Sequence, residues 1–253
     1  MKKIIVTALS AVGLLASGVV VADSHSELPD FAPIETYTCN YNEGMGPEDL
    51  DEAAAGWNKW MDDEGQGNYW AATVVPVYFG PDAFDFGWIG SWTSGTEMGT
   101  GTDKWLTEGG EYAAKFAAVA DCNTHSGFAG SMIKAPPDTS PDTIVLAFSD
   151  CNITTDDPNA DLFAKFAQWT EFAEERGYKN GAWVLFPVYG AGGAKFDFKM
   201  VQGYDSFADQ GADWDLYASG DYVKAGEINA GDWECDDARI YRATVRRRIA
   251  EED

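Results

Sequence analysis

Two stretches of the chain share one pattern: residues 75–92 read VPVYFGPDAFDFGWIGSW, and residues 186–204 read FPVYGAGGAKFDFKMVQGY. Each stretch places Pro-Val-Tyr before a glycine-containing loop and Phe-Asp-Phe after it. Alternating apolar residues on both sides of such a loop are typical of two strands joined as a hairpin. The chain therefore repeats one hairpin about half its length apart.

The spacing between equivalent residues is nearly constant well beyond the hairpins. Positions that recur 112 residues apart include Cys39 and Cys151, Trp57 and Trp169, Asp85 and Asp197, and Trp92 and Tyr204. Cys122 and Cys235 follow at a spacing of 113. A fixed offset over this length indicates a tandem duplication. We predict repeats at residues 23–134 and 143–253, joined by a Pro-rich linker at 135–142.

Both repeats show the same order of strand and helix patterns, βαββαβ. In the first repeat we predict strands at 35–40, 69–78, 84–92 and 126–134, a helix at 47–63 and a glycine-interrupted helical stretch before the last strand. In the second we predict strands at 143–148, 182–189, 196–204 and 233–246, a helix that starts at Asp157 and Pro158, and a weaker helical region at 205–225. The fold class is α+β, with two tandem ferredoxin-like units.

The four cysteines fit this topology as two disulfides. In a βαββαβ unit the first and last strands are antiparallel neighbours, so the end of one lies beside the start of the other. Of the three ways to pair the cysteines, only Cys39 with Cys122 and Cys151 with Cys235 keeps each bridge within one repeat at matching positions. A metal site is the alternative, but the cysteines lack the close pairs typical of zinc ligands, and we expect no metal.

The N-terminus has the features of a secretory signal peptide. Lys2 and Lys3 precede an apolar run at residues 4–21, and Ala22 offers a small residue for cleavage. Residues 1–22 are then the signal, and 231 residues remain. An uncleaved membrane anchor is the alternative. Export to the periplasm or beyond would also keep disulfides oxidised.

The net charge of -25 limits the partners of the chain. An acidic surface repels phosphate backbones and anionic lipid, so we expect no nucleic-acid partner and no membrane partner after signal cleavage. High solubility is the simplest reading of the charge. With 14% aromatic residues, the chain has ample material for a folded core.

The two repeats resemble the dimeric α/β-barrel superfamily. The resemblance rests on their order of elements and on the sequence MVQGYDSFAD at residues 200–209, in which the third strand of the second repeat leads into the next helical region. The resemblance is strongest to its NIPSNAP, stress-responsive barrel and antibiotic-monooxygenase-like branches. It implies two plaits packed sheet against sheet as an intramolecular pair, hence a monomer, with a pocket between the sheets or under the helix edges. The first repeat departs from the motif, since it reads GSWTSGTEMG at residues 90–99.

The third strand of each repeat supplies the candidate ligand site. Alternation gives two sets per strand, and we expect the aromatic set, rather than the set with Ile89 and Val201, to face the space between the sheets. Simple core packing is the alternative for these side chains. The candidate ligand-binding residues are Trp57, Trp88, Trp92, Trp169, Met200, Gln202 and Tyr204.

Catalytic groups are scarce. His25 lies near the mature N-terminus, and His125 has Ala238 at the matching position of the second repeat. Haem-binding members of the superfamily use a proximal histidine, but we interpret His125 as a surface residue and expect no cofactor. Asp85 and Asp197 are weak candidates for a general base if buried, and solvated hairpin residues otherwise.

Three function classes remain. The first is an exported protein that binds a small apolar or aromatic molecule. The second is a cofactor-free enzyme similar to the barrel monooxygenases, and the third is a structural or partner-binding exported protein. Because catalysis needs positioned titrating groups, binding is the preferred interpretation, and whether the chain is an enzyme stays open.

Overall fold

The computed structural model describes residues 30–250, except for 82–83, 138, 140 and 157–160. The first half contains β1 (Ala32–Tyr41), α1 (Pro47–Asp63), β2 (Tyr69–Tyr78), β3 (Phe86–Trp92), α2 (Gly95–Glu108), α3 (Gly110–Val119) and β4 (Ala120–Lys134). The second half contains β5 (Thr143–Ile153), α4 (Leu162–Arg176), β6 (Gly181–Tyr189), β7 (Phe198–Tyr204), α5 (Phe207–Leu216), the π-helical turn η1 (Tyr217–Asp221), α6 (Tyr222–Asn229), β8 (Trp233–Cys235) and β9 (Arg239–Arg247). The predicted signal peptide and the helix start at Asp157 and Pro158 lie outside the described residues.

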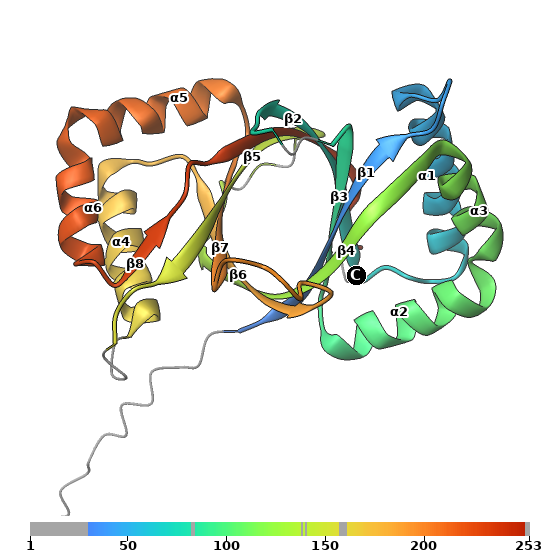
Figure 1. The fold of residues 1–253 in the computed structure, drawn as a ribbon, viewed down its shortest axis with the longest axis horizontal. Coiled ribbons are helices and arrows are strands. Elements are labelled where there is room, and N and C mark those ends of the chain that lie inside the picture. The colour runs from blue at the N-terminus through green and yellow to red at the C-terminus, as the bar shows by residue number, and fades with distance from the viewer. Residues whose placement is uncertain (1–29, 82–83, 138, 140, 157–160, 251–253) are drawn as a thin grey trace, which may run out of the picture.

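The strands form a closed antiparallel barrel, which Figure 1 shows end-on. They pair in the order β7-β6-β4-β1-β3-β2-β9-β5, and β5 pairs with β7 to complete the ring. The short β8 pairs with β5 beyond the end of β9. The two halves are thus hydrogen-bonded edge to edge, through β2 with β9 and β4 with β6. Closure removes the sheet edges that two separate plaits would expose.

Within each half the strands follow one order, β4-β1-β3-β2 and β9-β5-β7-β6. In both, the first strand lies between the last and the third, as in a βαββαβ unit. The helices lie outside the barrel, α1 to α3 against the first half and α4 to α6 on the opposite side (Figure 1). An origin of the two halves by duplication stays a prediction.

Helix α1 has the start and length that its sequence predicts. Pro47 occupies the first turn, and the backbone N–H of Gly46 donates to Asp49 Oδ2 at 2.8 Å. These contacts satisfy helix-start groups that would otherwise lack partners. The buried face of the helix consists of Leu50, Ala53, Ala54, Trp57, Trp60 and Met61.

Side chains from both halves pack inside the barrel. Ile89 of β3 shares a buried cluster with Leu146 and Tyr241 from the second half. Val201 of β7 shares another cluster with Phe128 of β4. One core therefore joins the two halves, and neither half buries its sheet alone.

The aromatic set of the third strands faces the helices, so the prediction that it faces the space between the sheets is wrong. Phe86 packs against Leu50 of α1, and Phe198 packs against Phe166 of α4. Because side chains alternate across a strand, this arrangement turns Ile89 and Val201 inward. Phe84 and Phe196, which precede the two strands, do pack against the barrel clusters.

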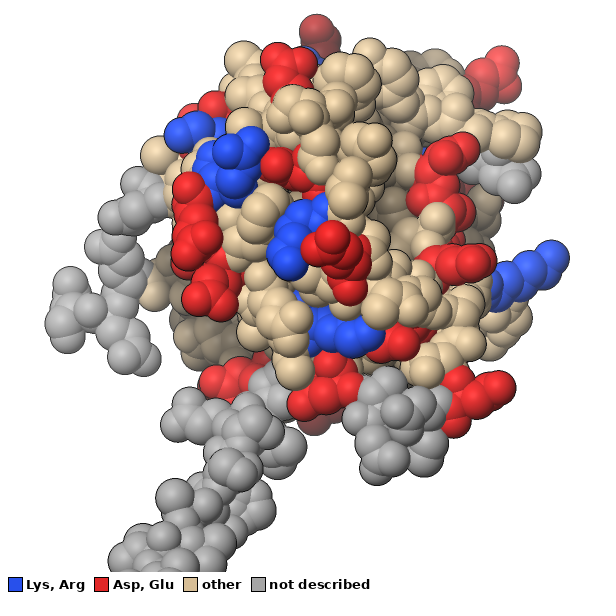
Figure 2. All heavy atoms as spheres, turned by 90° about the vertical axis from the view of Figure 1, so that its left-hand side faces the viewer, with Lys and Arg blue, Asp and Glu red and all other residues tan. Residues whose placement is uncertain are grey.

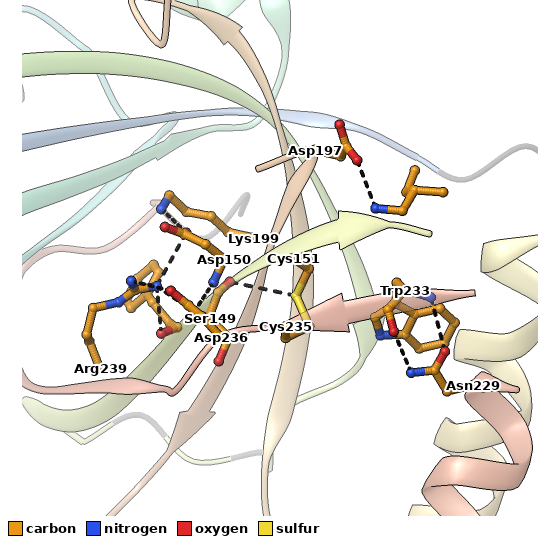
Figure 3. The surroundings of a disulfide bond; sticks show 12 residues. Ser149, Asp150, Cys151, Asp197, Lys199, Asn229, Trp233, Cys235, Asp236 and Arg239 are labelled. Atoms are coloured by element: carbon orange, nitrogen blue, oxygen red, sulfur yellow. Dashed lines mark hydrogen bonds and ion pairs between the residues drawn. A yellow bond between two sulfur atoms is a disulfide. The ribbon is translucent and has the colours of Figure 1, made fainter. Parts of the chain in front are cut away.

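Both predicted disulfides are present. Cys39 is bonded to Cys122 and Cys151 to Cys235, and each bridge spans 83 or 84 residues within one half. Figure 3 shows the second bridge beside a group of charged residues. There Asp150 pairs with Lys199 and, at 3.4 Å, with Arg239, which also pairs with Asp236 at 2.9 Å. The bridge and the ion pairs together hold the end of β5.

The face that carries α4, α5 and α6 displays acidic side chains interspersed with fewer basic ones (Figure 2). Arg176 pairs with Asp221 at 3.0 Å and Lys224 with Glu227 at 3.2 Å on these helices. The exposed pair of Lys224 and Glu227 contributes little to stability, whereas Asp221 is buried. Among the described residues, none of the helices has the length and apolar character needed to cross a membrane.

Candidate ligand-binding site

A pocket of about 390 Å³ lies in the first half, between α1 to α3 and the outer face of the barrel wall. Its lining is largely aromatic and apolar, and includes Leu50, Trp57, Trp60, Met61, Phe86, Trp88, Trp92, Trp105, Leu106 and Phe116. A concave, mostly apolar space of this size is typical of small-molecule sites. Its position under the helix edges is one of the two places that the resemblance implied.

Glu35 is the only carboxylate residue that lines this pocket among the described residues. Alternation along β1 places it on the helix-facing side together with Tyr37 and Cys39, which also line the pocket. In the ladder it lies opposite Gly90 of β3 and Gly127 of β4. The residues on both sides of Glu35 therefore lack side chains, which leaves space around the carboxylate.

The side chain of Tyr69 occupies the space above Gly90. A Cβ atom at Gly90 would lie 1.8 Å from the Tyr69 hydroxyl oxygen, so only glycine fits there. Trp92 similarly covers Gly101 of α2, where a Cβ atom would lie 2.1 Å from the indole ring. Two glycines thus make room for two large side chains, Tyr69 and Trp92, in the pocket wall.

Four side chains form a hydrogen-bond network centred on Glu35. Tyr69 donates its hydroxyl proton to Glu35 Oε1 at 2.7 Å, and Tyr37 donates to Oε2 at 3.3 Å. His125 Nε2 lies 2.9 Å from the same Oε2. Trp88 Nε1 donates to the Tyr69 hydroxyl at 3.0 Å, which fixes the direction of the chain from Trp88 through Tyr69 to Glu35.

The network keeps its tyrosines protonated. Burial raises the pKa of Tyr69 well above its ordinary value of 10.0, and the negative charge and hydrogen bond of Glu35 raise it further. Burial and Glu35 also raise the pKa of Tyr37. Both hydroxyls therefore act as fixed donors toward Glu35 at neutral pH.

The rings of the pocket present both edges and faces. Trp57 lies edge-on to Trp88, with ring centroids 5.1 Å apart and planes at 83°. Trp60 packs against Tyr112 at 5.5 Å and against Trp105 at 5.8 Å. These rings come from α1, β3, α2 and α3, so the packing of the helices on the sheet determines the shape of the pocket.

A second, more open hollow of about 670 Å³ adjoins the pocket. Glu35, Trp92, Thr102 and His125 line both. The Glu35 network therefore lies where the aromatic pocket meets an outer space that Phe31, Val188 and Tyr189 help to line. The Pro-Val-Tyr segment that ends β6 thus contributes its last residues to the wall of this outer space.

The structure divides the predicted ligand-binding residues between the two halves. Trp57, Trp88 and Trp92 line the pocket. Met200 packs against the cluster around Cys151 and Phe166, and Trp169 packs against Phe172 and Tyr178. Tyr204 donates to Gln202 at 2.7 Å. The last four predicted residues are thus separated from the pocket of the first half.

Among its described residues, the second half has no counterpart of the Glu35 network. Ala147 and Ser149 stand 112 positions after Glu35 and Tyr37, and Met200 stands 112 after Trp88. One buried carboxylate of the second half is Asp213, which accepts the backbone N–H groups of Lys179 and Asn180 at 2.7 and 3.0 Å. This carboxylate holds a loop in place, whereas Glu35 faces an open space.

Asp85 and Asp197 have matching structural contacts. Asp85 Oδ2 accepts the backbone N–H of Tyr41 at 2.8 Å, and Asp197 Oδ2 accepts that of Ile153 at 2.8 Å. Neither aspartate lines the two pockets described above. Both join the start of a third strand to the end of a first strand, next to a disulfide.

Contacts occupy one ring nitrogen and one ring face of His125. Its Nε2 atom faces Glu35, and its ring stacks on Tyr37 with centroids 3.9 Å apart. A proximal histidine presents a ring nitrogen to the iron, and here that atom would have to be Nδ1, because Nε2 faces Glu35. The cysteines are bonded in pairs and offer no thiolate. We therefore derive no chemistry through haem.

Sequence reasoning missed Glu35, Tyr37 and Tyr69. An isolated glutamate in a strand is usually solvated, so Glu35 carried no signal by itself. The useful sign was its alternation with Tyr37 and Cys39, because the disulfide prediction placed Cys39 in a buried position. A charged residue on the buried face of a strand indicates a polar site.

No protein-family model matches the chain, and a search of curated proteins finds no match. Solved structures do match it. A protein from Fusobacterium nucleatum provisionally assigned as a monooxygenase matches with 9% identity and a TM-score of 0.55, over 86% of this chain and 93% of its own. One from Lactobacillus acidophilus with the same assignment matches with 8% identity and a TM-score of 0.52, over 86% and 95%.

A protein provisionally assigned as a chlorite dismutase matches with 12% identity and a TM-score of 0.52, over 85% of this chain and 95% of its own. At such identities the likeness concerns the fold alone. The chain shares with these structures a closed antiparallel barrel with helices packed on its outside.

Proposed function

We propose that this chain binds a small organic molecule with an aromatic or apolar body in the pocket under α1 to α3. The observation that carries the proposal is the Glu35 network at the junction of an aromatic pocket and an outer hollow. A carboxylate that accepts from two tyrosine hydroxyls and has His125 beside it gives such a pocket one oriented polar group. Apolar walls with a few placed polar groups are what ligand sites combine.

Packing of the core alone explains this region poorly. Leu106 lines the pocket and yet remains 75% exposed. Protein interiors are close-packed, with few voids larger than a water molecule. A ligand with an apolar body would cover the exposed apolar walls and gain the associated free energy.

Purification of the protein from its own host tests the proposal. Native mass spectrometry should show a mass increment from a small molecule that is lost on denaturation. As an independent probe, N-phenyl-1-naphthylamine should bind with a rise in its fluorescence and compete with the purified ligand. Absence of both signals would contradict a binding role.

A second candidate function is cofactor-free oxygenation of an electron-rich aromatic substrate. The contact between His125 and Glu35 at the pocket entrance favours it, since a carboxylate-oriented histidine can act as a general base. Two of the structures with the same fold are provisionally assigned as monooxygenases. This pair would take the role that the sequence suggested for Asp85 or Asp197. The wild-type protein should consume oxygen when 1,4-naphthohydroquinone is added as substrate. The variant His125→Gln should lose this activity.

We also propose that the chain is exported and monomeric. The two disulfides favour an oxidising compartment, periplasmic or extracellular. The barrel closes within one chain, so no second copy is needed to satisfy its strand edges. Light scattering of the mature form should give about 25 kDa, at roughly 110 Da per residue. Assignment to the NIPSNAP branch and the domain limits stay predictions.

A further inference from the structure

We infer that the ligand of the aromatic pocket is an organic cation, a quaternary ammonium or protonated amine with an apolar body. The inference rests on the proposed function and specifies the chemistry of the same site. It follows from the charge, the open acceptor position and the ring surfaces that the pocket offers together.

The lining of the pocket and the outer hollow contains, among the described residues, one acidic residue, Glu35, and neither lysine nor arginine. His125 lies at the entrance, with its side chain 55% exposed, against 24% for Glu35. Lys104 of the nearby α2 pairs instead with Glu64 at 2.7 Å and with Glu108. An anionic ligand would meet a carboxylate here with no lysine or arginine to compensate it.

Glu35 keeps an acceptor position open. A carboxylate offers about four acceptor positions on its two oxygens. Oε2 accepts from Tyr37 and has His125 beside it, whereas within the described part of the chain Oε1 accepts from Tyr69 alone. The remaining position on Oε1 is available to a ligand N–H, or to the positive methyl groups around a quaternary nitrogen.

Desolvation decides between a cationic and a neutral ligand. The Glu35 side chain is 24% exposed and lines both the pocket and the outer hollow, so a ligand beside it covers part of the surface that still contacts water. A neutral apolar ligand would remove that water without replacing it, which is unfavourable for a buried charge. A cation would replace the water with an opposite charge, so its binding compensates Glu35.

The aromatic walls favour the same class of ligand. Ring faces carry the negative part of the aromatic quadrupole and attract cations, most strongly in tryptophan. Trp57, Trp88 and Trp105 line the pocket together with Tyr37, and Trp57 lies edge-on to Trp88. A pocket lined by several aromatic rings and one carboxylate has the composition of known ammonium sites. The net charge of -25 also raises the local concentration of cations.

A pair of isosteres tests the inference. Benzyltrimethylammonium and neopentylbenzene have the same shape and differ by a nitrogen in place of a carbon, and hence by one positive charge. Calorimetric titration of the full mature protein should show the cation binding about tenfold or more tightly than the neutral compound. Equal binding, or tighter binding of neopentylbenzene, would overturn the inference and leave the proposed function intact. Failure of both compounds to bind would contradict the proposed function as well.

Two variants test whether Glu35 causes the tighter binding of the cation. Glu35→Gln should reduce the ratio of the two affinities to near one by weakening the cation alone. Glu171→Gln is the matched control, because Glu171 is an exposed residue of α4 and its replacement changes the net charge equally. An unchanged preference in Glu35→Gln, with circular dichroism showing a native fold, would reject the assignment. If Glu35→Gln fails to fold, the comparison of the two compounds on the wild-type protein still tests the inference.

Discussion

The hydroxyl of Tyr69 on β2 donates to Glu35 Oε1 on β1 at 2.7 Å, although β3 separates the two strands. The contact crosses β3 at Gly90, the one place in that strand where Tyr69 finds room between the sheet and the pocket. The hydrogen bond to Glu35 therefore depends on the absence of a side chain at position 90 of β3.

Gly90→Ala should disconnect the network. The new methyl group would lie 1.8 Å from the Tyr69 hydroxyl and displace it from Glu35. We expect the affinity for benzyltrimethylammonium to fall about tenfold, and the free energy of unfolding to fall by ~1 to 3 kcal/mol from overpacking. Urea unfolding and calorimetry measure the two effects. Gly99→Ala is the control, since the space around Gly99 is open and alanine favours helix.

The chain should lose stability in alkali because of its buried tyrosines. Burial and Glu35 raise the folded-state pKa of Tyr69 and Tyr37 above the ordinary 10.0. The unfolded chain ionises these hydroxyls first, so their contribution is complete below pH 10 and is lost as the pH rises beyond it. Urea midpoints between pH 8 and 11 should fall above pH 10. Tyr69→Phe should flatten that fall, and an identical pH profile in this variant would contradict the assignment.

Reduction of the disulfides should destabilise the two halves similarly. Each bridge closes a loop of 83 or 84 residues, for which chain entropy gives about 4 kcal/mol. Two double variants test this, each without one bridge: Cys39→Ser with Cys122→Ser, and Cys151→Ser with Cys235→Ser. Both should lower the melting temperature by similar amounts. Non-reducing peptide mapping of the wild-type protein supplies the control. A bridge between the two halves in that map would be incompatible with the barrel register.

Asp85→Asn and Asp197→Asn should behave alike. Each aspartate accepts one backbone N–H at 2.8 Å beside a disulfide, and loss of the charged acceptor costs about 1 kcal/mol. Ligand affinity and any oxygen uptake should stay unchanged, because neither residue lines the pocket. A loss of turnover in either variant with unfolding energy preserved would restore that aspartate as a base.

Local patterns predicted the elements well and their orientation poorly. The limits of α1 and β2 match the expected residues, and topology alone gave the correct cysteine pairs. Alternation defined the two faces of β3 but not which face the helices cover, so Trp88 was placed on the wrong side. The outer face of β3 is as apolar as the inner one because α1 covers it. Several strand limits shifted because pairing with distant strands extends β1, β4 and β5 beyond their apolar runs.

The site was harder to predict because its chemistry depends on contacts between distant residues. Glu35, Tyr69 and His125 come from three strands and are separated by up to 90 positions. Their residue types are ordinary, and only the ladder register brings them together across Gly90. The aromatic residues Trp57, Trp88 and Trp92 were recognisable from composition, whereas the polar centre between them was not.

Trp88→Ala compared with Met200→Ala tests the central claim most directly, because the two residues hold matching positions on β3 and β7 and only Trp88 lines the pocket. The measurement is the dissociation constant of N-phenyl-1-naphthylamine, followed by its fluorescence in both variants and the wild-type protein. We predict a loss of about tenfold or more in Trp88→Ala and a change within about twofold in Met200→Ala. Equal losses in both variants, or a larger loss in Met200→Ala, would contradict a ligand site under α1 to α3.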